Sequence, residues 1–169
     1  AGVRQLVVPA TDADSWSRIH ALCGDRSDLH PAYGLHPLFM DRHRPEHLDR
    51  LGDWLGDHPA VAVGEIGLDH HDAGSDREQQ QRFFEIQLRL ARELELPVIV
   101  HARQALEEAS LALRRCPGVR GVVHSFSGSE QQAAKLWDIG FHLGIGGPVT
   151  YERAQRLRRI VAAMPIQFL

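Results

Sequence analysis

The amino-acid sequence predicts an α/β protein, a (β/α)8 barrel of the TIM type, on three observations. Seven short apolar runs alternate with six longer amphipathic stretches. The runs are continuously apolar, which is typical of parallel strands buried on both faces. The 169 residues fall short of the roughly 250 that a closed barrel needs. We therefore expect residues 1–169 to form a single TIM-barrel domain that lacks its first strand and the segment after strand eight.

The expected strands are the short apolar runs, which are too brief for helices and are bounded by turn residues. Taken in order, they are Gln5–Val8, Ala32–Leu35, Val61–Gly64, Val98–Val100, Gly121–Val123, Phe141–Gly144 and Ile166–Leu169.

The expected helices join these strands. Leu48, Leu51 and Leu55 recur at helical spacing, and Ser129 followed by Gln132 forms a capping-box pattern. Taken in order, the helices are Ala13–Leu22, Glu46–Leu55, Asp76–Glu95, Gln104–Arg115, Ser129–Ile139 and Tyr151–Ala163.

The composition narrows the classes of protein that fit. With 43% hydrophobic residues, 24% charged residues and a net charge of -3, the chain fits one globular core and has no overall basic surface for coating nucleic acid. Cys23 and Cys116 lack paired spacing, which argues against a disulfide framework or a cysteine zinc site. No run approaches the roughly 18 apolar residues of a membrane span. We expect a cytoplasmic protein with no membrane association and no obligate protein partner.

Polar residues follow four consecutive strands at the end where TIM barrels carry their sites. His36, Glu65, His101 and His124 each come directly after an apolar run. Nitrogen and oxygen ligands from separate strands suit a divalent cation such as Zn²⁺, Mn²⁺ or Mg²⁺. A single histidine of this kind is more often structural, and Glu65 alone could be a buried salt-bridge partner. Four such residues in order favour a metal site.

Five motifs in order resemble the TatD family of metal-dependent deoxyribonucleases, from about Val7 to Leu169. They are YGLHP (Tyr33–Pro37), VGEIGLD (Val63–Asp69), LPVIVHAR (Leu96–Arg103), HSFSGS (His124–Ser129) and LGIGGPVTY (Leu143–Tyr151). The resemblance implies an amidohydrolase-like (β/α)8 barrel and metal-dependent DNA hydrolysis, with 3'-5' exonuclease activity in some members.

On this resemblance Glu65 is the catalytic carboxylate shared by two divalent cations, and His101 and His124 each supply a nitrogen ligand. Members of the family also carry an Asp-Thr-His-x-His motif on the first strand and a Glu-Thr-Asp motif at the end of strand eight. Neither motif occurs in residues 1–169. The expectation is either a fragment of a longer protein or a barrel with an incomplete site.

Four further residues are candidates for substrate binding. Arg103 can pair with a phosphate or with a neighbouring loop carboxylate. We favour a hydrogen bond from His36 to substrate over a structural role. Ser125 and Ser127 can donate to phosphate or stabilise their own turn.

The sequence thus predicts a metal-dependent hydrolase, a TatD-type deoxyribonuclease that cleaves phosphodiester bonds by a metal-activated water. Its partner would be DNA or another phosphodiester substrate. Two alternatives stay open: an enzyme of the amidohydrolase fold acting on a small ester or amide, and a catalytically incomplete barrel fragment.

Overall fold

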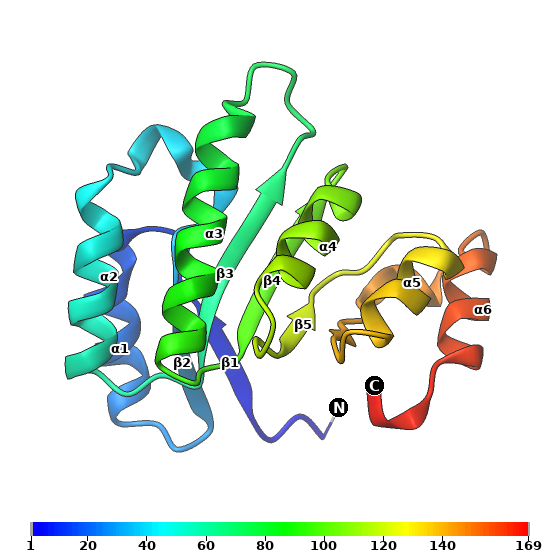
Figure 1. Cartoon of the computed structure of the whole chain (residues 1–169). Coiled ribbons are helices and arrows are strands. Elements are labelled where there is room, and N and C mark those ends of the chain that lie inside the picture. Colours follow the sequence, from blue (N-terminus) through cyan, green and yellow to red (C-terminus); the bar gives the residue numbers. More distant parts are fainter. Residues whose placement is uncertain (1, 169) are drawn as a thin grey trace.

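The computed structural model describes residues 2–168 and contains one parallel sheet of six strands in the order β1-β2-β3-β4-β5-β6 (Figure 1). Every neighbouring pair is parallel and consecutive in the chain, as expected of repeated β-α-β units. The strands are β1 (Leu6–Pro9), β2 (Leu29–Tyr33), β3 (Ala62–Asp69), β4 (Val98–Arg103), β5 (Gly121–Val123) and β6 (His142–Leu143).

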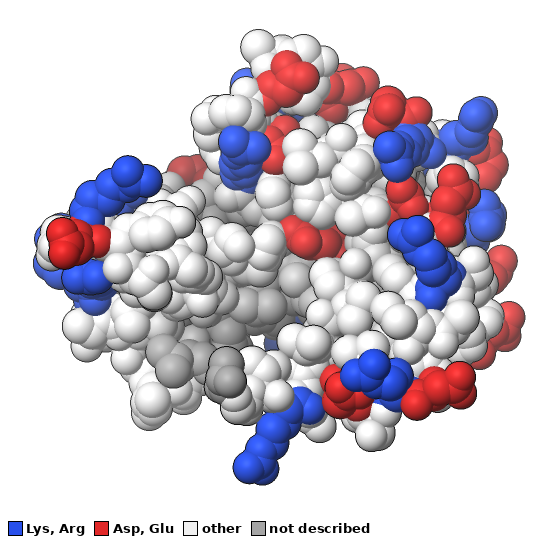
Figure 2. All heavy atoms as spheres, turned by 180° about the vertical axis from the view of Figure 1, so that it is seen from behind, with Lys and Arg blue, Asp and Glu red and all other residues white. Residues whose placement is uncertain are grey.

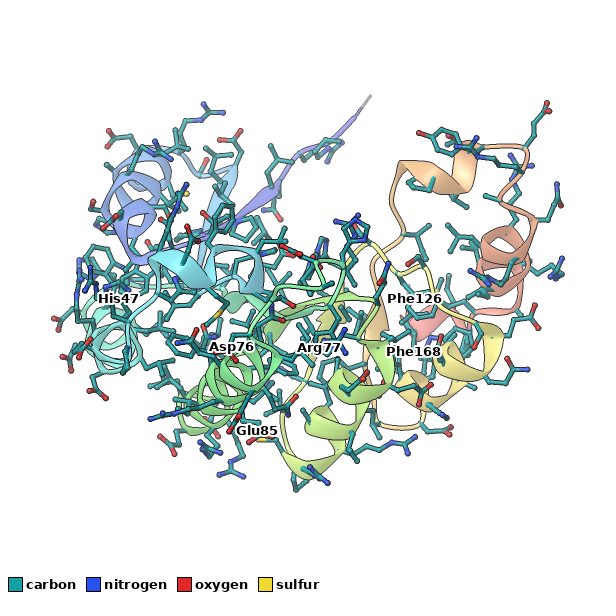
Figure 3. The ribbon with its side chains drawn as sticks, turned by 90° about the horizontal axis from the view of Figure 1, so that it is seen from above. His47, Asp76, Arg77, Glu85, Phe126 and Phe168 are labelled. Carbon is teal, nitrogen blue, oxygen red and sulfur yellow. The ribbon has the colours of Figure 1, made fainter. Side chains whose placement is uncertain are left out.

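The helices lie outside the curved sheet, and the view from above shows them as an arc around the strands (Figure 3). All six expected helices are present within a few residues of their expected ends. They are α1 (Trp16–Gly24), α2 (Glu46–Asp57), α3 (Arg77–Glu93), α4 (Leu106–Arg115), α5 (Glu130–Trp137) and α6 (Gln155–Ala163). Short 3-10 helices complete the chain: η1 (Ala13–Ser15), η2 (Pro37–Arg42), η3 (Gly147–Thr150) and η4 (Ile166–Phe168).

The core lies between the sheet and its helices. Val63, Ile66 and Val100 are fully buried on the strands, and Phe84 and Leu88 of α3 are buried in the same cluster. Every residue of β3 except Glu65 is buried, which explains why this strand is mostly apolar. Among residues 2–168, none of the helices combines the length and the hydrophobicity that crossing a bilayer would require.

The last expected strand, Ile166–Leu169, is wrong for the part that the structure describes, because Ile166–Phe168 form η4. The Phe168 N–H donates to the Pro165 carbonyl at 2.9 Å, which closes a tight turn, and Ile166 is 81% exposed. Leu169 lies outside the described residues. An apolar run predicts a strand only when a neighbouring strand pairs with it, and η4 has no such neighbour among residues 2–168.

The expected second strand is displaced. It begins at Leu29 rather than Ala32, because β1 pairs with β2 from Leu6 and Leu29 onward. Pairing along the edge of the sheet therefore extends the strand through His30 and Pro31, which the hydrophobic pattern does not indicate.

Among residues 2–168, no helix covers the inner face of the sheet. Figure 2 shows the molecule from behind, with a hollow near its centre and a group of acidic atoms at the edge of that hollow. The carboxyl ends of the parallel strands meet along one edge, so residues that end different strands are brought together there.

Gly67 is a position where the sheet excludes a side chain. Its φ of +136° lies in the region that favours glycine, and a Cβ there would collide with the His101 carbonyl oxygen of β4. Gly67 therefore permits the close pairing of β3 with β4 that brings Glu65 near His101.

We expect Gly67→Ala to lower the free energy of unfolding by at least about 2 kcal/mol, because the strained backbone and the collision act together. Urea unfolding followed by circular dichroism measures the change. Gly56→Ala in α2 is the matched control, because a Cβ at Gly56 meets nothing within 4 Å. Equal stabilities for the two variants would contradict the role given to Gly67.

Candidate metal centre

Four of the predicted site residues lie together at the carboxyl ends of consecutive strands. His36 follows β2 and caps η2, Glu65 lies within β3, His101 within β4, and His124 follows β5. The strand-end pattern therefore predicted their proximity correctly.

Glu65 reaches the site because β3 is irregular at this point. The pairing of β3 with β4 shifts register between Gly64 and Ile66, so Glu65 has no partner in that ladder. Its N–H donates instead to the Ala10 carbonyl just beyond β1, at 3.1 Å. Bulges of this kind re-aim a side chain, and here the carboxylate is turned into the cluster.

Three imidazoles contact one oxygen of Glu65. Its Oε1 lies 3.2 Å from His36 Nε2 and 3.2 Å from His101 Nδ1, and it also contacts His124 Nε2. The nitrogens of His101 and His124 that face Glu65 are 3.4 Å apart. The Glu65 side chain is 13% exposed, whereas that of His124 is 34% exposed and forms the open side of the cluster.

The carboxylate of Glu65 stays ionised. Burial opposes its ionisation, but hydrogen bonds from His101, His124 and His36 outweigh this and hold its pKa far below the usual range. The cluster therefore offers a fixed negative charge surrounded by nitrogen ligands.

Asp69 orients His101. Its Oδ2 lies 2.8 Å from His101 Nε2, and its Oδ1 accepts from the His71 N–H at 3.0 Å. A carboxylate can only accept, so Nε2 carries a proton, and Nδ1, which faces Glu65, is protonated as well only in the imidazolium form. Burial disfavours the imidazolium form of His101, but hydrogen bonds to Glu65 and Asp69 outweigh it and raise the pKa of His101.

His36 is oriented differently. The Leu38 N–H donates to His36 Nδ1 at 3.1 Å, so neutral His36 carries its proton on Nε2, which points at Glu65. His43 is buried and its Nε2 lies 2.9 Å from the His36 carbonyl oxygen, which fixes the backbone at this point. The Nε2 of His36 is close enough to join a metal site, but this tautomer makes His36 a donor to the carboxylate.

Two buried glutamines of α3 hold the strand ends in place. The amide of Gln87 accepts from the Leu35 N–H at 2.8 Å and donates to the Leu35 carbonyl at 3.3 Å. Gln80 makes the same pair of bonds with Asp69, at 2.9 and 3.0 Å. One helix therefore positions the residue before His36 and the carboxylate that orients His101.

Three predicted substrate-binding residues lie on the rim without joining the cluster. Arg103 ends β4, is exposed, and has no side-chain hydrogen bond within residues 2–168. Ser125 and Ser127 are exposed on the loop after His124, and the Ser127 carbonyl accepts from Arg156 at 3.0 Å. Their roles remain predictions.

Sequence reasoning missed Asp69, His43, Gln80 and Gln87. The signal for Asp69 was available, because an acid at the end of a buried strand needs a partner. The signal for the two glutamines was weaker: they stand seven residues apart in an amphipathic helix, on the face that carries Phe84 and Leu88.

The fold and the cluster define a class of protein: an α/β barrel-type protein with a candidate metal centre at the carboxyl ends of its strands. The model for the family TatD related DNase matches residues 1–169. The chain belongs to this family, as its motifs indicated.

Relatives and solved structures agree with this assignment. The chain is 41% identical over 172 residues to an uncharacterized metal-dependent hydrolase, YjjV, of Escherichia coli strain K12, covering 100% of this chain and 66% of that protein. It is 34% identical over 170 residues to the 3'-5' ssDNA/RNA exonuclease TatD of Cronobacter sakazakii, covering 98% of this chain and 64% of that protein. The chain thus spans less than two thirds of the length of these curated relatives.

The crystal structure of YjjV from Escherichia coli matches with a TM-score of 0.93 at 40% identity, over 98% of this chain and 65% of that chain. A TatD family hydrolase from Entamoeba histolytica matches with a TM-score of 0.78 at 20% identity, over 99% of this chain and 59% of that chain, and supports the fold alone. The predicted TIM-type barrel fold is confirmed by these matches.

We expect Asp69→Asn to weaken divalent-metal binding about 10- to 100-fold, because the amide no longer fixes the tautomer and orientation of His101. Isothermal titration calorimetry with Mn²⁺ measures the affinity. Asp72→Asn is the control, because Asp72 lies exposed on the following loop and its side chain accepts from the Gly74 N–H. An unchanged affinity in Asp69→Asn would contradict the orienting role.

Metal affinity should also depend on pH. A proton on His101 Nδ1 competes with a cation, and the pKa of His101 is raised above its ordinary value. Affinity should therefore keep rising as the pH increases above the ordinary pKa of histidine, with release of a proton on binding, because the competing proton is lost only as the pH passes the raised pKa. Calorimetry in buffers of different ionisation enthalpy counts the proton. Affinity that is flat across this range would be inconsistent with His101 as a ligand.

Proposed function

We propose that this protein is a divalent-metal-dependent phosphodiesterase, a TatD-type deoxyribonuclease that acts on DNA or a related phosphodiester. The observation that carries the proposal is the convergence of His101 and His124 on one oxygen of the partly buried, ionised Glu65. The family supports hydrolysis, and the name of one relative indicates exonuclease activity on single-stranded nucleic acid.

The donor set fits a divalent cation. Glu65 supplies a carboxylate that stays anionic, His101 presents Nδ1 with its ring fixed by Asp69, and His124 completes the set from the exposed side. Mixed nitrogen and oxygen ligands suit Zn²⁺ or Mn²⁺, and Mg²⁺ with more water. Within residues 2–168, the side-chain contacts of Glu65 all go to Oε1. Oε2 is thus available to a second cation, as expected of a carboxylate shared by two metals.

A divalent cation bound here supplies Lewis-acid polarisation of a phosphoryl oxygen and lowers the pKa of water toward neutrality. The residues of this chain position the carboxylate and contact the substrate. The Nε2–H of His36 holds the carboxylate of Glu65 in place. Arg103, exposed at the end of β4, pairs with a phosphate oxygen of the substrate, and the hydroxyls of Ser125 and Ser127 lie on the rim as further donors.

We expect Glu65→Gln to reduce kcat for metal-dependent hydrolysis of single-stranded DNA at least about a hundredfold, because a neutral amide removes the charge that binds the cation. Nucleotide release and metal content by mass spectrometry should fall together in the full-length protein. Glu78→Gln, in the exposed first turn of α3, is the control and should match the wild type.

The same assay tests the competing substrate class. A p-nitrophenyl ester is offered beside the oligonucleotide. Metal-dependent cleavage of the ester alone would reject the nuclease in favour of a small-molecule hydrolase, and full activity in Glu65→Gln would reject the role of Glu65.

A further inference from the structure

The turn that follows His36 carries a stripe of side chains leading away from the metal cluster. His36, Phe39 and Arg42 are spaced three residues apart, and η2 is kinked at Phe39, whose backbone is not helical. The contacts between these side chains define the stripe. The rings of His36 and Phe39 have centroids 5.8 Å apart, and the Arg42 guanidinium carbon lies 5.0 Å from the Phe39 centroid. The stripe therefore runs from His36, which contacts Glu65, to Arg42.

Arg42 is held in a fixed orientation. Its Nη1 lies 3.2 Å from Asp12 Oδ2, and Asp12 is itself held by a capping box with Ser15. Asp12 is largely buried, whereas the Arg42 side chain is 58% exposed. One edge of the guanidinium is thus paired with Asp12, and one face lies over the Phe39 ring. Over half of the Arg42 side chain is open to solvent.

The side of η2 next to this stripe is acidic rather than basic. Leu38 and Asp41 line a hollow of about 540 Å³ together with Asp69, Asp72 and Asp76. The exposed carboxylates of Asp41, Asp72 and Asp76 would repel a phosphate backbone, so the stripe of Phe39 and Arg42 is the more favourable side for a nucleic-acid strand at the metal cluster.

We propose that Phe39 and Arg42 form a stacking platform for the nucleobase next to the phosphodiester that is hydrolysed. This inference rests on the proposed function and names its substrate class: single-stranded nucleic acid, recognised through an unpaired base. Bases stack on aromatic rings and on guanidinium planes without regard to sequence. The pairing of Arg42 with Asp12 offsets its charge, which suits a flat stacking surface better than a phosphate contact.

The test compares two oligonucleotides of equal length with the full-length protein and Mn²⁺. One is oligothymidylate, and the other has a tetrahydrofuran abasic site at the nucleotide beside the cleaved bond. Phe39→Ala and Arg42→Ala should each raise KM for the base-bearing oligonucleotide about tenfold. They should leave kcat and the KM of the abasic oligonucleotide within about twofold of wild type.

Two further variants separate stacking from charge. Arg42→Lys keeps the charge but not the plane, so it should behave like Arg42→Ala. Arg50→Ala removes a similar contact between Arg50 and Trp16, at 5.9 Å, on the outer helices and should change neither KM. Rescue by Arg42→Lys, or an equal loss on the abasic oligonucleotide, would make Arg42 a phosphate contact and overturn the proposal.

Fluorescence anisotropy with labelled oligonucleotides keeps the proposal separate from the proposed function. If the wild type cleaves neither oligonucleotide, the nuclease assignment fails. Tighter binding of the base-bearing oligonucleotide, lost in Arg42→Ala, would still support the platform. Equal binding of both oligonucleotides would overturn it.

Discussion

The structure around the site depends on one constraint, the partial burial of the ionised Glu65 carboxylate. A buried charge is costly unless partners compensate it, and here the compensation comes from three imidazoles on three different strand ends. No single strand could supply them at this spacing. The parallel order of the sheet is therefore what makes an ionised Glu65 tolerable, and the same arrangement makes it able to hold a cation.

Helix α3 packs against the hydrophobic core and also holds the backbone of two strand ends near the metal cluster. Gln80 and Gln87 stand about two turns apart, so they share a face of the helix with the apolar residues that pack on the sheet. Each is almost fully buried and uses its amide to bind the backbone of a strand end. A shift of this helix would thus move Leu35 and Asp69 together, and with them the histidines that these residues position.

The fold class, the six helices and the proximity of Glu65, His101 and His124 could be predicted from the sequence, because continuous apolar runs mark parallel strands and polar residues mark their ends. Other features depended on tertiary pairing. Ile166–Phe168 have the composition of a strand but no neighbour to pair with among residues 2–168. The tautomers of His36 and His101 follow from single contacts with Leu38 and Asp69, which no periodicity indicates.

The kink at Phe39 makes the length of this turn as important as its composition. It divides η2 into the turn that His36 caps and the turn that ends at Arg42. The deletion of one residue between His36 and Arg42 would therefore change where the arginine lies relative to the Phe39 ring. Substitutions that keep the number of residues preserve this backbone path, while insertions and deletions within the turn would alter what the entrance to the cluster presents.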